Sequence, residues 1–395
     1  MKDTLTAQLS RIHQASDIPG FSVAIVSDKI VMYKNGFGYR NLTTKEPFTT
    51  ETIQNIGSIT KTFIAFALMK LVEDGKLELD DNIDQYIPFK ITNPHFPNNS
   101  ITIRQLATHT SSLTDGEDQM IIEKSYLLHE PTNFKKEDLP EDWFDYYQLY
   151  NTNKKMTIPR FLHNTYCKEG EWYSPKNFLN AAPGTMYEYT NIGATLLAHI
   201  IEIVAEKSFD KYVQEIILEP LAMEQTYWSW VEADSSDLSV GKELAGNRIS
   251  HYLPGNIAVP AYDLITYPDG GLITNISDFT IYLQEMIRGL NGESKLLSLA
   301  SYKEMMSNQL IPDHFPNGDF TFSRGLLWRA NSQGDNISAS GTDPGVVTDC
   351  MFTTGGNIGL VIFFNKSLYD DEKGEDAFRK IRQLLMKYAG KLRRE

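Results

Sequence analysis

Segments with the residue pattern of β-strands lie at both ends of this chain, and helical patterns occupy the long stretch between them. Two of these segments, residues 21–26 and 30–39, are rich in β-branched and aromatic residues. The others follow the helical region, at residues 320–330, 337–340, 346–353 and 358–365. Strands first and last with helices between predict a discontinuous α/β lobe, which both ends of the chain close around a helical lobe.

Three helices have clear signals in the sequence. Leu5, Leu9 and Ile12 give the first residues an amphipathic pattern. Residues 61–73 carry apolar side chains on one face, and Gly75 suits the carboxyl end of that helix. A basic helix is expected at residues 372–391, after the last strand.

Composition excludes several classes of protein. The 395 residues are 41% hydrophobic, enough for a large core. A net charge of −14 disfavours binding to nucleic acids or to anionic membranes, since both need basic patches. No stretch approaches the roughly 18 consecutive apolar residues of a membrane span. Residues 1–10 lack the apolar core of a signal peptide, so the sequence as written indicates a cytoplasmic protein, or an exported one if a signal was removed. The compartment stays open.

Neither histidines nor cysteines show the spacing of a metal site. Cys167 and Cys350 lie far apart in the sequence, and we expect both to be free thiols. The eight histidines show no pairing at metal-ligand spacing, and His109, within a Thr-His-Thr turn, is expected to be structural. The sequence therefore predicts no metal and no other cofactor.

The motif Ser58-Ile59-Thr60-Lys61 precedes the apolar helix at residues 61–73. Residues three apart are neighbours on a helix surface, so Lys61 can lie beside the Ser58 hydroxyl and accept its proton. The positive end of the helix dipole at Ser58 would favour an oxyanion and keep Lys61 partly deprotonated. On its own the motif is weak, because an N-cap serine followed by a solvated lysine gives the same letters.

Further motifs follow in a fixed order and make the chain resemble a family. The segments that carry the resemblance are 37–41, 55–63, 103–113, 183–193, 269–278 and 325–328. Together with Ser58 and Lys61 they resemble the serine β-lactamase-related superfamily, in its class C branch with penicillin-binding proteins, D-peptidases and esterases. That resemblance implies an antiparallel five-stranded sheet flanked by helices, plus a mainly helical lobe. It also implies one catalytic unit over residues 1–395, with the α/β lobe at about 1–57 and 310–395 and the helical lobe at about 58–309.

The resemblance also assigns roles to residues in the middle of the chain. Tyr189 would touch Ser58 and act with Lys61 as general base, then as acid toward the leaving group. A phenol with an ordinary pKa of about 10 needs a nearby cation for this, and Lys61 is the candidate. Asn191 would donate to a substrate carbonyl and contact the Lys61 region. A loop tyrosine followed by a capping asparagine is the structural alternative.

The third element of the site departs from the family pattern. The aligned strand segment carries Ala339, Ser340, Gly341 and Thr342, so alanine replaces the usual lysine or histidine. The resemblance implies that this cation helps to bind substrate carboxylates, which Ala339 cannot do. Gly341 still permits close approach of the strand, and the N–H of Thr342 can complete an oxyanion hole with the N–H of Ser58. This favours ester or neutral amide substrates.

Residues 115–182 form a longer insertion than many relatives have between these motifs. Its aromatic side chains are Trp143, Phe144, Tyr146, Tyr147, Tyr150, Trp172 and Tyr173. They would either form a wall or lid over the active site or pack the insertion onto the helical lobe.

The leading hypothesis is a serine hydrolase that works through an acyl-enzyme on an ester, a D-peptide or a β-lactam, with a small-molecule or peptide substrate. One alternative is a cell-wall D-peptidase of the penicillin-binding type. The other is a ligand-binding or scaffolding protein that keeps the fold but has lost turnover because of Ala339. The sequence leaves the oligomeric state open.

Overall fold

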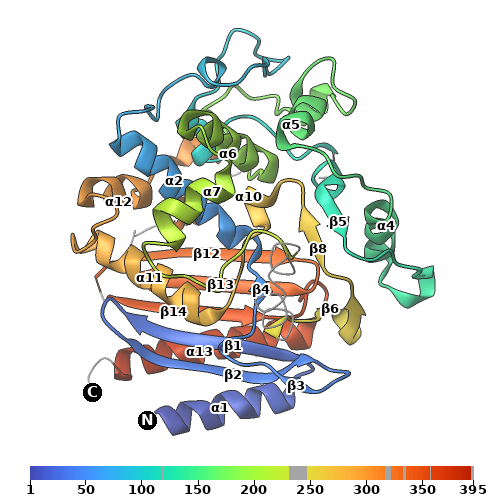
Figure 1. The fold of residues 1–395 in the computed structure, drawn as a ribbon, viewed down its shortest axis with the longest axis vertical. Helices are drawn as coiled ribbons and strands as arrows, with labels where there is room; N and C mark the ends of the chain where they lie inside the picture. The colour runs from blue at the N-terminus through green and yellow to red at the C-terminus, as the bar shows by residue number, and fades with distance from the viewer. Residues whose placement is uncertain (118–119, 231–246, 316–321, 332–334, 356, 393–395) are drawn as a thin grey trace.

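A large antiparallel sheet organises the fold in the computed structural model (Figure 1). The structure describes residues 1–395 except 118–119, 231–246, 316–321, 332–334, 356 and 393–395. Across the sheet the strands run β10-β11-β12-β13-β14-β1-β2-β3. The amino-terminal strands are β1 (Gly20–Ser27), β2 (Val31–Asn41) and β3 (Glu46–Pro47). The carboxyl-terminal strands are β10 (Phe322–Arg324), β11 (Arg329–Asn331), β12 (Asn336–Asp343), β13 (Val346–Thr353) and β14 (Ile358–Phe364).

The two ends of the chain meet at the centre of this sheet. β1 pairs with β14 over its whole length, from Phe21 opposite Phe364 to Ser27 opposite Ile358. The α/β class expected from the sequence is confirmed, but five strands was too few. Among the described residues the sheet has eight strands, counting β3, which has only two residues and pairs with the end of β2. Five of them are long, and the others are too short for a sequence pattern to reveal.

The segment at 320–330 is not one strand, as the sequence suggested. Residues 320–321 lie outside the described residues, and the remainder forms β10 and β11 with a turn between them. Leu327 in that turn has a left-handed backbone, with φ of 55°. Its N–H donates to the carbonyl of Ala107, while Trp328 is fully buried. The turn between the two strands lets Trp328 pack in the core and Leu327 contact the helical lobe.

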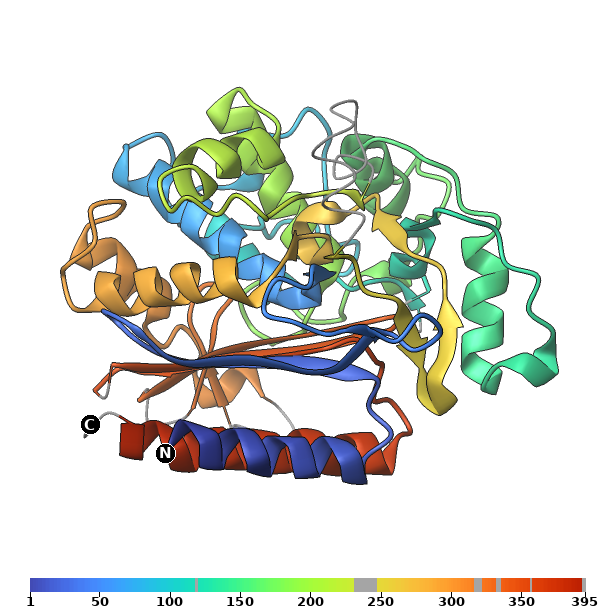
Figure 2. The same ribbon diagram turned by 60° about the horizontal axis from the view of Figure 1, so that its bottom comes forward.

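Two helices cover the outer face of the sheet, α1 (Lys2–Ala15) and α13 (Glu372–Leu392), and lie side by side (Figure 2). The i, i+4 spacing of Leu5 and Leu9 puts both side chains against the strands, and both are fully buried. Ile381 and Leu385 have the same spacing in α13 and join this core layer.

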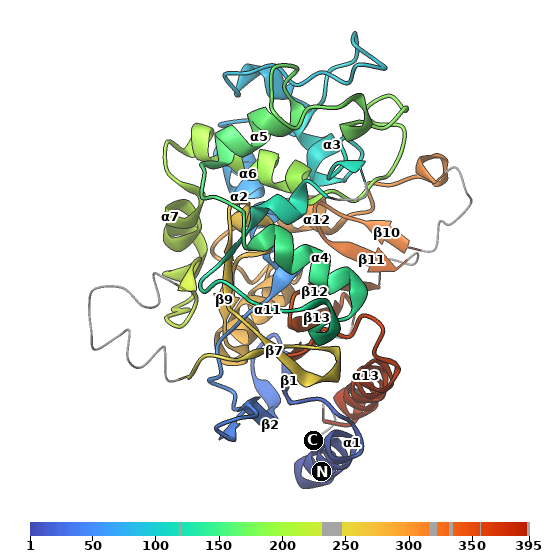
Figure 3. The ribbon, with the colours of Figure 1, turned by 90° about the vertical axis from the view of Figure 1, so that its right-hand side faces the viewer.

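The opposite face of the sheet packs against the helical lobe (Figures 2 and 3). Its helices are α2 (Lys61–Glu73), α3 (Ile103–Ala107), α5 (Ile158–Tyr166), α6 (Asn191–Ala205), α7 (Phe209–Val213), α10 (Tyr267–Gly270), α11 (Ile276–Leu290) and α12 (Leu299–Met306). α2 and α6 are apolar on nearly all sides, which is typical of helices at the centre of a core. The ring of Phe63 in α2 stacks on Tyr282 of α11 with centroids 4.1 Å apart.

The insertion adds a side layer beside the sheet and the helical lobe. It contains β5 (Tyr126–Leu128) and α4 (Glu141–Tyr150), and β5 pairs with β8 (Tyr262–Leu264). The remaining short strands are β4 (Gln54–Asn55), β6 (His251–Leu253), β7 (Ile257–Val259) and β9 (Ile273–Thr274). Pairing of β4 with β9 fixes the chain just ahead of Ser58.

In the part of the chain that the structure describes, no helix is long and apolar enough to cross a membrane. Cys167 and Cys350 are buried free thiols.

If α13 is held by its apolar face, Leu385→Ala should lower the free energy of unfolding by about 3 kcal/mol, because it leaves a cavity against the sheet. Urea unfolding followed by circular dichroism measures this. Met386→Ala, at the adjacent and largely exposed position, is the matched control and should cost about 0.5 kcal/mol or less. Equal losses at the two positions would contradict the packing described.

Candidate active site

Ser58 lies in a 3₁₀ turn, Gly57–Thr60, that leads directly into α2. The turn packs against the end of β12 and is held by buried backbone contacts: the N–H of Ile56 donates to the carbonyl of Leu272. Gly57 has φ of +52°, and a Cβ there would lie 3.0 Å from the nitrogen of Thr342. Glycine is therefore required for the turn to approach the strand.

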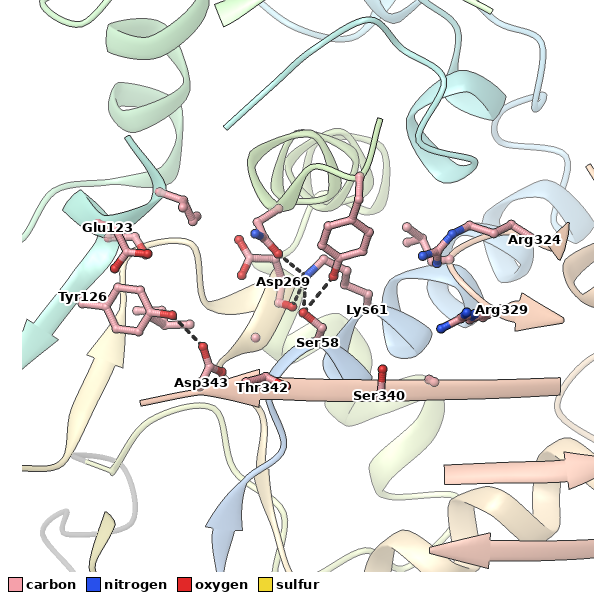
Figure 4. A pocket seen from close by; sticks show the side chains of 18 of the residues that line it. Ser58, Lys61, Glu123, Tyr126, Asp269, Arg324, Arg329, Ser340, Thr342 and Asp343 are labelled. Atoms are coloured by element: carbon pink, nitrogen blue, oxygen red, sulfur yellow. Dashed lines mark hydrogen bonds between the residues drawn. The ribbon is translucent and has the colours of Figure 1, made fainter. Parts of the chain in front are cut away.

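Lys61 is almost fully buried, and its ammonium has three hydrogen-bond acceptors (Figure 4). Nζ donates to Ser58 Oγ at 3.0 Å, to Asn191 Oδ1 at 2.7 Å and to the carbonyl oxygen of Asp269 at 2.7 Å. Burial lowers the pKa of Lys61, but attraction to Tyr189 and Asp269 outweighs this, so the pKa rises above its usual value. This is opposite to the expectation that the helix dipole keeps Lys61 partly deprotonated.

Tyr189 comes from the segment that precedes α6, and its hydroxyl donates to Ser58 Oγ at 2.8 Å. Two cations face the ring: Lys61 Nζ is 5.2 Å from the ring centroid and the Arg324 guanidinium is 5.4 Å from it. The imidazole of His109 packs against the same ring, with centroids 4.5 Å apart. Burial, followed by the charges of Arg324 and Lys61, lowers the pKa of His109, so this histidine is neutral.

Asp115 holds the beginning of α6 and was not among the residues singled out in the sequence. One carboxylate oxygen accepts from the N–H and side-chain amide of Asn191 at 2.9 and 2.8 Å. The other accepts from the Thr190 hydroxyl at 2.6 Å and the Ile192 N–H at 2.9 Å. These bonds orient the side-chain oxygen Oδ1 of Asn191 toward Lys61. A helix amino terminus attracts a carboxylate, but the 76 positions between Asp115 and Asn191 hide the pairing in the sequence.

The edge of β12 forms the floor beside Ser58. β11 pairs only with Ile337 and Ser338, which leaves the later part of that edge beside the Ser58 turn. A Cβ on Gly341 would lie 2.1 Å from the carbonyl oxygen of Ile56 and 2.9 Å from the nitrogen of Ser58. The strand and the turn are therefore in backbone contact at Gly341, next to Thr342.

These groups border a cleft of about 350 Å³ (Figure 4). The residues proposed from the sequence that line it are Ser58, Lys61, Tyr189, Asn191, Ala339, Ser340 and Thr342. Gly341 is buried beneath the floor. The sequence analysis missed Glu123, Arg324, Arg329 and Asp343, which also line the cleft. Three of them lie on short elements and Asp343 is the last residue of β12, and no periodic pattern marks any of the four.

The insertion borders the cleft, but not through the aromatics named from the sequence. Its contribution is Ile122, Glu123, Ser125 and Tyr126. None of the seven named aromatics lines the cleft in the described structure. Tyr147 and Tyr150 pack with Tyr126 and Tyr262 in a separate apolar cluster, while Trp172 packs against the core of the helical lobe.

A metal centre finds no support at this site. Among the residues that the structure describes, no group of three or more His, Cys, Asp or Glu side chains is arranged to hold an ion.

A sheet closed by both chain ends, a helical lobe, and a Ser-x-x-Lys turn between them define the β-lactamase and penicillin-binding class of fold. The chain belongs to the beta-lactamase family, whose model matches residues 6–384.

Two curated proteins illustrate the likeness. Protein flp of Staphylococcus aureus (strain N315) is 25% identical over 353 residues, which cover 89% of this chain and 60% of that protein. Penicillin-binding protein 4* of Bacillus subtilis (strain 168) is 25% identical over 285 residues, 72% of this chain and 51% of that one. The chain thus spans only part of the length of these relatives.

Solved structures agree on the fold. An octameric penicillin-binding protein homologue from Pyrococcus abyssi has a TM-score of 0.66 and 26% identity, over 92% of this chain and 73% of that one. A class C beta-lactamase has a TM-score of 0.67 and 19% identity, and the match covers 97% of each chain.

Asp115→Asn should destabilise the protein by about 2 kcal/mol, because an amide NH₂ would face backbone and side-chain donors at the start of α6. Thermal or urea unfolding measures the loss. Glu117→Gln is the control: Glu117 is an exposed carboxylate two residues further on, paired with Lys176, and its loss should cost about 0.5 kcal/mol or less. If the two variants lose equal stability, Asp115 does not anchor the helix.

Burial raises the pKa of Asp343 to about 7. Ionising this carboxyl therefore costs the folded state more than the unfolded state, and wild-type protein should lose stability as pH rises from about 4 to about 7. Asp343→Asn stays neutral, so its stability relative to wild type should improve by about 2 kcal/mol between pH 5 and pH 8. Urea unfolding at both pH values tests this. Asp370→Asn, at an exposed position, should follow the pH dependence of wild type.

Proposed function

We propose that this protein is a serine hydrolase that forms an acyl-enzyme on Ser58 from an ester or amide substrate. The observation that carries the proposal is the contact of three side chains: Ser58 Oγ accepts hydrogen bonds from both Lys61 and Tyr189. A serine hydroxyl needs an adjacent group to take its proton, and this arrangement supplies one. Membership of the beta-lactamase family supports the same chemistry.

The steps follow from the positions of these groups. Tyr189, whose hydroxyl donates to Ser58 Oγ in the structure, first releases its proton to water and then, as phenolate, takes the Ser58 proton while Oγ bonds to the substrate carbonyl carbon. Lys61 Nζ and the Arg324 guanidinium lie 5.2 and 5.4 Å from the Tyr189 ring centroid, so two positive charges adjoin the group that carries the proton. The carbonyl oxygen becomes an oxyanion, which the N–H groups of Ser58 and Thr342 bind. Tyr189 then returns the proton to the leaving group, and water hydrolyses the acyl ester to release the acid and restore Ser58.

Lys61 acts mainly through its charge in this scheme. Its ammonium donates to three acceptors and its pKa is raised, so it stays protonated near neutral pH. Asn191 accepts one of these bonds and in turn donates its side-chain amide to Asp115. One side-chain N–H of Asn191 is thus engaged within the protein, which positions Lys61, and the second N–H can donate to a substrate carbonyl.

Ala339 does not leave this part of the cleft uncharged. Arg324 at the end of β10 and Arg329 at the start of β11 line the cleft on the Tyr189 side (Figure 4). Burial and the charge of Arg324 lower the pKa of Arg329, so the two guanidinium groups are close enough to repel. Because the general acid adjoins the leaving group, these arginines belong to the leaving-group side of the cleft. Anionic and polar leaving groups are therefore compatible with Ala339.

A fluorophosphonate probe tests the nucleophile directly. Wild-type protein should gain one probe mass on the peptide that contains Ser58, and Ser58→Ala should gain none. Tyr189→Phe keeps the ring but removes the hydroxyl, and it should react about 10²- to 10⁴-fold more slowly. Mass spectrometry after proteolysis locates the adduct. A wild-type protein without an adduct on Ser58 would overturn the proposed function.

Turnover separates a hydrolase from a protein that only binds its ligand. Short acyl nitrophenyl esters, D-alanyl peptides and a chromogenic cephalosporin cover the three substrate classes. Product release with repeated turnover supports the proposal, and the rates rank the classes. A stable acyl adduct that does not hydrolyse would instead support a binding protein.

A further inference from the structure

The cleft around Ser58 has opposite charges at its two ends (Figure 4). Arg324 and Arg329 lie on one side of Ser58, and Glu123 and Asp343 lie on the other. Arg324 is on the side of Tyr189, 5.4 Å from the centroid of its ring. If Tyr189 protonates the leaving group, the arginine end receives the leaving group. The carboxylate end must then receive the acyl half of the substrate.

Hydrogen bonds from tyrosines hold the two carboxylates in place. Asp343 Oδ1 accepts from the Tyr126 hydroxyl at 2.6 Å, and Glu123 accepts from the Tyr150 hydroxyl. Tyr126 and Tyr150 stack with ring centroids 4.8 Å apart, which fixes the positions of both hydroxyl donors. Both carboxylates are thus fixed in position. Glu123 belongs to the insertion, and Asp343 is the last residue of β12.

No cation is paired with the carboxylates at this end of the cleft in the described part of the chain. Neither Glu123 nor Asp343 forms an ion pair with any residue in the described part of the chain. Lys61 faces Asp343, but its three hydrogen bonds go to other groups. Burial raises the pKa of each carboxyl to about 7, and the charge of Lys61 offsets this only in part at Asp343.

Two buried polar atoms at this end of the cleft, Ser125 Oγ and Asp343 Oδ2, have no hydrogen-bond partner among the described residues. Ser125 is fully buried and lines the cleft, and its Oγ is unpaired. Asp343 Oδ2 is buried and unpaired as well. Buried polar atoms are seldom left unsatisfied, so unpaired acceptors at a cleft wall point to a ligand that donates hydrogen bonds.

We infer that the acyl half of the substrate carries a primary ammonium group, which Glu123, Asp343 and Ser125 bind. An ammonium has three N–H donors and one positive charge, which matches two carboxylates and one hydroxyl. A neutral amide donor would satisfy the hydroxyl but leave the two carboxylates uncompensated. This assignment rests on the proposed acyl-enzyme chemistry at Ser58 and adds the substrate class: aminoacyl esters or amides with a free amino group.

Matched nitrophenyl esters test the inference. The glycine ester is compared with the propionate ester, and the β-alanine ester with the butyrate ester, because each pair differs by an ammonium in place of a methyl group. The readout is the ratio of kcat/KM for the charged ester to that for the neutral one, corrected for spontaneous hydrolysis. We expect Glu123→Gln and Asp343→Asn each to lower this ratio at least tenfold for the β-alanine and butyrate pair at pH 8, where an α-amino group such as that of the glycine ester is only partly protonated.

Glu117→Gln is the control variant, since it removes an exposed carboxylate of the same insertion away from the cleft. It should leave the ratio and both rates at the wild-type level. Circular dichroism confirms that each variant is folded.

The possible outcomes are distinct. An unchanged ratio in Glu123→Gln and Asp343→Asn would overturn the ammonium site, and so would an equal fall in both rates, which indicates a structural role. If wild-type protein hydrolyses the neutral esters, the proposed function stands whatever the ratio shows. If it hydrolyses none of the four esters and the probe leaves Ser58 unmodified, the proposed function fails, and this inference fails with it.

Discussion

A single buried ammonium connects the parts of this site. Lys61 reaches from α2 to Ser58 in the preceding turn, to Asn191 on α6 and to the backbone of Asp269 in α10. A buried cation costs several kcal/mol unless polar groups replace its lost water, and here three acceptors from three elements do so. The relative positions of α2, α6 and α10 are therefore tied to one side chain, and the same positions bring Tyr189 to Ser58.

Further hydrogen bonds and ring packing fix the groups around the Lys61 ammonium. Asp115 uses both carboxylate oxygens on the start of α6, which directs the Asn191 carbonyl toward Lys61. Asp269 gives Lys61 its backbone oxygen, while its carboxylate accepts from Thr195 at 2.8 Å. The neutral ring of His109 packs on Tyr189 and accepts from the Thr190 N–H. Each group near the nucleophile is thus fixed by a second one, which preorganises the site before substrate arrives.

The sequence predicted those features that depend on local patterns. Helix 61–73 was expected with the bounds that the structure gives, and β1 and β14 were found to within one residue because both are continuous apolar runs. The contact of Tyr189 with Ser58 came from motif order rather than from spacing, since 131 positions separate them. Glu123, Asp343 and Asp115 were missed because their importance comes from burial and from distant partners. No local pattern encodes either property.

Ala339 shows why the charge of a cleft cannot be read from one motif position. Losing a lysine at that position suggested a cleft less able to bind anions, but β10 and β11 are separated by a turn that a strand prediction did not anticipate. That turn places Arg324 and Arg329 at its two ends, on the wall of the cleft. Charge at an active site depends on which side chains reach the cavity from every element around it. Here the positive charge of Arg324 and Arg329 comes from β10 and β11, and Ser58 lies between that charge and the carboxylates of Glu123 and Asp343.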